Sequence, residues 1–144
     1  MNVCETLEKF DYNNIFYTES IKNTVIDNSS FIRILYSNKL FTLNGIYLMI
    51  RFNDIFLENI NYKYKYCFNI EKNFKLVNFI KDLEYNILKG ANIKNKILST
   101  KFYDQLKCGF IKIASENVGV DTKDFILKIS GVWESTQEYG LDRK

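Results

Sequence analysis

The chain of 144 residues contains no histidine and no proline, and it has only three cysteines and six glycines. Without histidine it lacks the commonest general base near neutral pH, and neither a Ser–His nor a Cys–His nucleophile pair can form. The glycines are scattered, so they make no GxGxxG or P-loop phosphate-binding segment. We therefore predict that the protein is not an enzyme.

The three cysteines, Cys4, Cys67 and Cys108, are far apart and form no CxxC pair. With no histidine to complete a ligand set, we expect no zinc site, no disulfide framework and no cofactor. A reduced, cytoplasmic compartment is the expected location. The first residues are acidic where a signal peptide is basic, and no stretch approaches the roughly 18 apolar residues of a membrane span. We expect neither secretion nor a membrane partner.

Asparagine, lysine, isoleucine, tyrosine and phenylalanine supply 74 of the 144 residues. Their codons are largely AT-rich, so the coding DNA is expected to be AT-rich, and lysine positions are more informative than lysine number. Residues 61–112 hold 11 basic and 4 acidic side chains, whereas residues 1–60 and 113–144 are each net acidic. A basic central band is typical of a protein with one polyanion-binding face. The alternative is a solvated lysine-rich surface without a partner.

Dense apolar and aromatic residues predict strands at 30–37, 45–57, 61–70, 108–115 and 123–135. Asn-Gly turn chemistry between the first two favours a hairpin or meander. The third strand is expected beside the second, which gives a curved antiparallel sheet. Residues 1–29 show no clean period, so we expect an irregular or partly helical lead-in.

The strongest helix signal lies between Asn73, a residue type that caps helix starts, and Gly90, which favours a helix stop. Apolar residues recur between them at helical spacing, namely Leu76, Val77, Ile80, Leu83, Ile87 and Leu88. Residues 91–107 are expected to form a basic loop followed by a short helix. Three strands, a helix and two strands is the order of an OB-type barrel. We predict one mainly β domain over residues 1–144, a β-barrel of OB-fold type with one major helix between strands 3 and 4; the alternative is an α+β open sheet.

The strand predicted at 61–70 has two unlike faces. One face carries the rings of Tyr62, Tyr64, Tyr66 and Phe68, and the other carries Lys63 and Lys65. We expect the rings to fill the core, since burying each contributes about 2 kcal/mol, and the lysines to face outward. The alternative is that the aromatic face is a platform for stacking bases. Because a buried tyrosine hydroxyl needs a partner, we also expect one or two of the three tyrosines to emerge at a barrel mouth, where they could stack on bases.

Outward residues of the neighbouring strands complete a candidate nucleic-acid interface. In the strand at 45–57 the apolar face is expected to be Ile46, Leu48, Ile50 and Phe52. Tyr47 and Arg51 then point outward and could share an exterior face with Lys63 and Lys65. Further cations, expected to contact phosphates, lie on the connection after the helix: Lys89, Lys94, Lys96 and Lys101.

The stretch KDFILKISGVWESTQEYGL, residues 123–141, resembles a C-terminal element of small proteins from large cytoplasmic DNA viruses and from yeast cytoplasmic linear killer plasmids. Those relatives include single-stranded DNA-binding proteins. The resemblance implies an OB-like protein that binds single-stranded DNA in replication or recombination.

Within this stretch, Gly131 stands in strand context, where glycine marks a bulge or a close backbone approach. Trp133 shares the parity of Leu127 and Ile129, so it is either a core residue or a base-stacking one. Lys128 lies on the opposite parity. We include Lys128 and Trp133 in the candidate interface.

These observations predict a sequence-tolerant single-stranded DNA-binding protein that supports replication of an AT-rich extranuclear element. One alternative is an RNA-binding module of a transcription assembly, because the 2′-hydroxyl that separates RNA from DNA recognition leaves no sequence signal. Another is a virus-like host-interaction or structural subunit, in which exposed tyrosines form a protein interface. A homo-oligomer is also compatible with the sequence.

Overall fold

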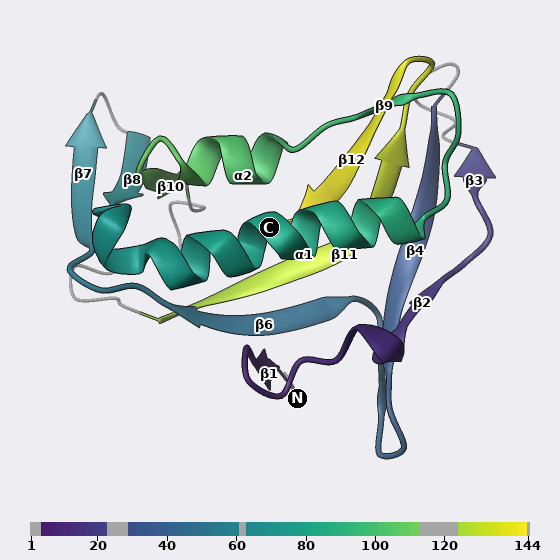
Figure 1. Ribbon diagram of the computed structural model, residues 1–144, viewed down its shortest axis with the longest axis horizontal. Helices are drawn as coiled ribbons and strands as arrows, with labels where there is room; N and C mark the ends of the chain where they lie inside the picture. Colours follow the sequence, from purple (N-terminus) through teal and green to yellow (C-terminus); the bar gives the residue numbers. More distant parts are fainter. Residues whose placement is uncertain (1–3, 23–28, 61–62, 113–123, 144) are drawn as a thin grey trace.

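The computed structural model describes residues 4–22, 29–60, 63–112 and 124–143. They form a mixed α+β structure with two open sheets and one long helix (Figure 1). The strands in these ranges close no barrel. The α+β open sheet, given above as the alternative, is therefore the architecture found, in place of the predicted barrel.

The larger sheet has nine strands and is organised around β11 (Asp124–Glu134). One edge of β11 pairs with two different strands, because residues 124–129 pair with β6 (Ile46–Arg51) and residues 131–134 pair with β4 (Ser30–Ser37). The other edge pairs with β12 (Glu138–Arg143), which the sequence did not predict. The predicted pairing of the strand at 30–37 with the strand at 45–57 is thus wrong, since both pair with β11 instead.

The remaining strands of the larger sheet are short. They are β1 (Glu5–Thr6), β2 (Ile15–Tyr17), β3 (Ile21–Lys22), β5 (Thr42–Leu43) and β9 (Ile97–Leu98). β2, β3 and β5 pair with β4, β1 pairs with β6, and β9 pairs with β12. The lead-in therefore supplies three strands and a 3-10 turn, η1 (Tyr12–Asn14), where irregular or partly helical structure was expected.

The smaller sheet contains β7 (Phe56–Ile60), β8 (Lys63–Cys67) and β10 (Phe110–Lys112), with β8 in the centre. The single strand predicted at 45–57 is in fact β6 and β7, because the chain turns between them at Asp54, whose φ is +54°. The strand predicted at 61–70 lies beside the second of these pieces. The two sheets meet through core aromatic contacts: Tyr66 with Phe125 at 5.0 Å and Phe52 with Phe68 at 4.7 Å between ring centres.

Helix α1 (Phe74–Gly90) crosses one face of the larger sheet, and the short α2 (Lys101–Leu106) lies alongside it (Figure 1). All six apolar residues that predicted this helix are buried. Asn73 occupies the N-cap position, as predicted, but its side chain makes no capping hydrogen bond to the helix. Its buried amide instead accepts a hydrogen bond from the Asn53 N–H and donates to the carbonyls of Asn53 and Asn69, which ties η2 (Glu71–Asn73) to the end of β6.

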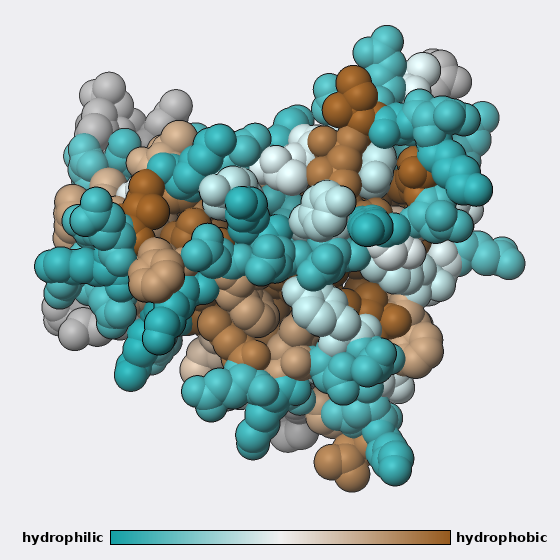
Figure 2. Space-filling view, in the orientation of Figure 1, coloured by the Kyte–Doolittle hydropathy of each residue, from teal (hydrophilic) through white to brown (hydrophobic). Residues whose placement is uncertain are grey.

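The predicted core faces are confirmed where the structure describes them. Ile46, Leu48, Ile50 and Phe52 are buried, as are Tyr66 and Phe68. Tyr62 and the side chain of Tyr64 lie outside the described residues. Figure 2 shows the face of the molecule that carries the helices, on which hydrophilic side chains predominate and hydrophobic ones form small separate groups. None of the helices in the described ranges has the length and apolar character needed to cross a bilayer.

Candidate nucleic-acid interface

A β-bulge in β11 decides which way Trp133 points. The pairing of β11 with β12 shifts register between Ile129 and Gly131, and Ile129 and Val132 are both fully buried although three positions apart. One extra residue reverses the parity of everything after it. The expectation that Trp133 shares a face with Ile129 is therefore wrong, and Trp133 lies on the same face as Lys128. We call this face of the larger sheet, turned away from the buried core, the outer face.

At the β6 end, the outer face consists of three cross-strand pairs: Tyr47 with Lys128, Met49 with Ile126, and Arg51 with Asp124. The Lys128 ammonium lies 5.5 Å from the centre of the Tyr47 ring. Met49 and Ile126 are 42% and 50% exposed. The Arg51 guanidinium donates two hydrogen bonds to Asp124, at 2.7 and 3.2 Å, so its charge is matched inside the pair.

At the β4 end, two aromatic rings lie across glycines. Phe31 and Trp133 are cross-strand partners, and Trp133 also pairs with Gly140 of β12. A Cβ atom on Gly131 would lie 2.6 Å from Cζ of Phe31, and one on Gly140 would lie 2.6 Å from Cζ2 of Trp133. Each ring therefore rests on the backbone of the neighbouring strand. Both side chains remain partly exposed, so neither is a core residue.

Cations flank these rings. The Lys101 ammonium, at the start of α2, lies 5.2 Å from the centre of the Trp133 ring. Arg33 is exposed on β4 as the cross-strand partner of Gly131. Within the described ranges no ion pair holds Arg33 or Lys101. Aromatic surface and available positive charge are thus combined on one sheet face.

The lysines after α1 do not form one cluster. Lys96 makes an ion pair with Glu134 at 2.6 Å, and the two side chains are only 24% and 19% exposed. The Ser30 hydroxyl donates to the second carboxylate oxygen, and the pKa of Glu134 is lowered, chiefly by the hydrogen bond from Lys96. Lys89 lies 5.9 Å from the Tyr85 ring, and Lys94 is exposed in the turn before β9. Of the four predicted lysines, Lys101 is the one placed against Trp133.

Lys65 lies on β8, in the smaller sheet, and its ammonium is 5.0 Å from the Phe110 ring. It does not share a face with Tyr47 and Arg51, because β8 is hydrogen-bonded to β7 and β10 and not to β6. Lys63 begins the same strand, but its side chain lies outside the described residues. The single exterior face expected from the sequence is therefore divided between two sheets.

Sequence reasoning missed Phe31 and Arg33. A usable signal is present in SFIRILYS, because Ile32, Ile34 and Tyr36 alternate with Phe31 and Arg33 at strand period. The three alternating partners are all buried, which leaves Phe31 and Arg33 on the outer face. Arg33 lies outside the basic central band of residues 61–112, so the distribution of charge along the sequence does not mark it.

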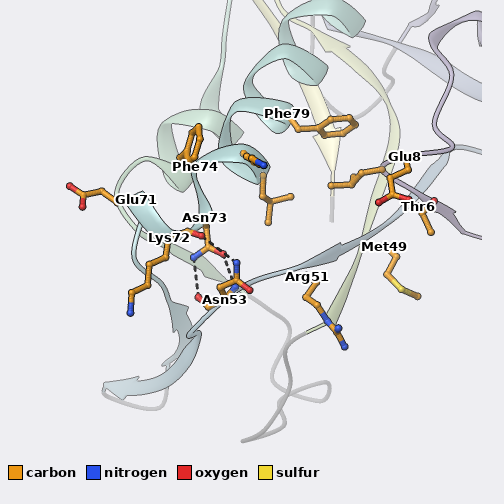
Figure 3. Close-up of a pocket in the computed structure, with 13 residues that line it drawn as sticks. Thr6, Glu8, Met49, Arg51, Asn53, Glu71, Lys72, Asn73, Phe74 and Phe79 are labelled. Atoms are coloured by element: carbon orange, nitrogen blue, oxygen red, sulfur yellow. Dashed lines mark hydrogen bonds between the residues drawn. The ribbon is translucent and has the colours of Figure 1, made fainter.

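A hollow of about 720 Å³ lies between the N-terminal segment, the end of β6 and the start of α1 (Figure 3). Arg51 is paired with Asp124 there, and Lys72 with Asp54 at 2.8 Å. Figure 3 shows the Asn73 amide hydrogen-bonded to Asn53 below the helix start. These groups bind one another, so we assign the hollow no ligand. The described ranges hold no group of three or more acidic or cysteine side chains placed to bind a metal.

No family model, no curated protein and no solved structure matches the chain. Its function is therefore inferred from its own surfaces.

Proposed function

We propose that the protein binds single-stranded DNA with little sequence preference, through the outer face of the larger sheet, in support of replication of an AT-rich extranuclear element. The observation that carries this proposal is the row of rings and cations on that face. Phe31 and Trp133 offer flat apolar surfaces with Arg33 and Lys101 beside them, and Lys128 supplies positive charge beside the Tyr47 ring.

Stacking and charge together suit an unpaired strand. A base on an aromatic ring contributes about 1–3 kcal/mol whatever its identity, because every base has a π-face. Phosphate contacts add affinity that falls with salt and carries no sequence information. A duplex hides its base faces, so rings lying flat on a sheet gain nothing from it. This combination supports tolerance of sequence and preference for single strands.

A protein interface is the second candidate, and a specific observation favours it. Ile21 is 60% exposed and pairs with Phe31, and Phe16 is 52% exposed on the neighbouring strand. Apolar side chains beside the proposed DNA surface are also what a host-interaction or structural subunit presents. An RNA-binding module differs from the lead proposal only in its ligand, so the test includes an RNA oligonucleotide. Absence of binding to every oligonucleotide would favour the protein interface.

Trp133 is the single tryptophan of the chain, so its fluorescence reports directly on the proposed site. We expect oligo(dT) to quench this fluorescence and to bind more tightly than duplex DNA of equal length. Phe31→Ala should weaken binding by about 1–3 kcal/mol, the value of one stacked base. Phe74→Ala, which removes an exposed ring at the start of α1, is the matched control and should bind like the wild type. Equal affinity for duplex would overturn the proposal, and tighter binding of oligo(rU) would favour the RNA alternative.

The salt dependence of binding separates Lys101 from Lys96. If Lys101 moves from the Trp133 ring to a phosphate, Lys101→Gln should lower the slope of log affinity against log salt by about 0.7. Lys96→Gln should leave the slope unchanged, because Glu134 already neutralises that ammonium. Titrations at four or more salt concentrations measure both. An equal loss of slope in the two variants would mean that the ion pair opens on binding and that the loop acts as a unit.

A further inference from the structure

The solvent side of the smaller sheet carries a second set of rings and cations. Its cross-strand rows are Phe56–Cys67–Phe110 and Glu58–Lys65–Lys112. The alternate residues face the core, since Tyr66 and Ile111 are 1% and 8% exposed. These six side chains therefore share one face, which we call the second surface.

The second surface places an aromatic ring between two ammonium groups. Lys65 and Lys112 lie 5.0 and 5.9 Å from the centre of the Phe110 ring, and Phe56 is 59% exposed. The only acid in these two rows, Glu58, accepts a hydrogen bond from the Cys67 thiol at 3.1 Å. Burial and the neighbouring Glu58 raise the pKa of that thiol, so it adds no negative charge.

The two lysines occupy an unfavourable position relative to each other. Lys65 and Lys112 are direct cross-strand partners, and like charges directly opposite on neighbouring strands destabilise a sheet. Glu58, the other cross-strand partner of Lys65, offsets part of this repulsion but leaves the row net positive. An anion that contacts both ammonium groups relieves this repulsion. The exposed Phe56 ring and the partly exposed Phe110 ring match the flat faces of bases, so a polyanion with unstacked bases complements the surface in both charge and shape.

We propose that the second surface is a second contact for the same bound DNA strand, with Lys65 and Lys112 on phosphates and the rings of Phe56 and Phe110 beneath bases. This inference rests on the proposed function. The two sheets meet through the contact of Tyr66 with Phe125, which lies next to the Arg51–Asp124 end of the outer face. A strand long enough to leave the outer face at that end reaches the second surface, and a short one does not.

The test compares two oligonucleotide lengths, because only the longer one can occupy both surfaces. Oligo(dT) of about 6 and about 30 nucleotides brackets the site size of typical single-strand binders. Binding is followed by Trp133 quenching and by anisotropy of labelled DNA. The double variant Lys65→Gln, Lys112→Gln should bind the long oligonucleotide about tenfold more weakly, with a salt slope lower by about 1.4, and should bind the short one like the wild type.

A double variant with the same change in charge, Lys75→Gln, Lys81→Gln, alters two exposed lysines of α1 and should leave both affinities unchanged. Phe56→Ser removes one ring of the second surface without changing its charge, so it tests the contribution of the ring separately from that of the lysines. Thermal melting shows whether each variant is folded, and the two single lysine variants replace the double one if it is not.

Several outcomes would overturn the inference. Unchanged affinity for the long oligonucleotide removes the second surface from the bound path. Equal loss for both lengths in a folded variant contradicts a second contact that only long strands reach. Loss of self-association in Phe56→Ser, measured by sedimentation, assigns the surface to a second copy of the chain. If long DNA binds without quenching Trp133 and the lysine variant abolishes that binding, the outer-face proposal fails while the second contact stands. Absence of any binding by the wild type refutes both.

Discussion

Replacing Glu84 by alanine is expected to destabilise the fold by about 3–5 kcal/mol, because one buried and one partly buried backbone donor lose their acceptor. The Glu84 side chain comes from the middle of α1 and is 1% exposed. Its two carboxylate oxygens accept hydrogen bonds from the N–H groups of Phe102 and Tyr103, at 3.1 and 2.9 Å. These N–H groups belong to the first turn of α2, which has no intrahelical partners for them. Urea denaturation measures the change.

Two variants isolate the cause. Glu84→Gln keeps the shape and one acceptor oxygen but turns an amide toward the second N–H, so we expect a smaller loss, about 1–3 kcal/mol. Asp82→Ala removes an exposed acid from the same helix and should change stability by less than about 0.5 kcal/mol. If Glu84→Ala were no more destabilising than Asp82→Ala, the start of α2 would have to find other acceptors.

The same carboxyl gives stability a pH dependence of defined sign. Burial raises the pKa of Glu84, against the opposing effects of the Tyr103 and Phe102 N–H groups and of Arg143. A carboxyl whose pKa is higher in the folded state stabilises the fold at low pH, and this contribution is lost as pH rises through the folded pKa. The stability of the wild type relative to Glu84→Gln should therefore fall from acidic toward neutral pH. Glu134, whose pKa is lowered, should show the opposite trend against Glu134→Gln.

Loss of Glu84 also affects the proposed interface. Lys101 is the first residue of α2 and immediately precedes the two N–H groups that Glu84 holds. If the first turn of α2 opens, the Lys101 ammonium is no longer fixed beside Trp133. A buried acid on the opposite helix therefore positions a cation of the outer face, which no pattern in the sequence near Lys101 reveals.

The sequence predicted elements with a strong local period. β4 has the predicted bounds, β11 falls within its predicted range, and the apolar stripe of α1 is buried as expected. β4, α1 and the part of β11 before its bulge each bury one continuous face, so period and burial agree there. The predicted barrel is not found among the described residues, because a barrel depends on which strands pair, and local sequence period carries no information about pairing. Pairing here is set by β11, whose two halves pair with β6 and β4. The paired residues are between 73 (Asp124 with Arg51) and 104 (Glu134 with Ser30) positions apart in the sequence.

The candidate site was predicted less well than the main elements, because its residues depend on a strand irregularity and on contacts between distant residues. Period-2 reasoning placed Tyr47 and Lys128 correctly on the outside, because no irregularity interrupts the pairing of residues 124–129 with β6. It failed for Trp133, because the bulge at Gly131 adds one residue. It could not distinguish Lys96 from Lys101 either, since the ion pair with Glu134 depends on a contact 38 residues away.

Replacing Gly131 by alanine is expected to cost about 3 kcal/mol or more, because the new Cβ would overlap the backbone carbonyl oxygen of Ile32 and lie 2.6 Å from the Phe31 ring. The ring can rotate away, but the carbonyl is held in the central pairing of β4 with β11. The least strained response is a local shift of register, which returns Trp133 toward the buried side. We therefore expect loss of both stability and oligo(dT) binding, measured by urea denaturation and Trp133 quenching.

Gly140→Ala is the matched control, because the three atoms nearest its Cβ all belong to the Trp133 ring, the closest being Cζ2 at 2.6 Å, and a side chain can move where a backbone cannot. We expect this variant to keep most of its stability and to bind DNA more weakly, since the ring no longer rests flat on β12. The two variants thus separate the backbone role of one glycine from the ring-supporting role of the other. Wild-type stability in Gly131→Ala would mean that β11 accommodates a side chain at the bulge and that Trp133 is turned outward by its own packing.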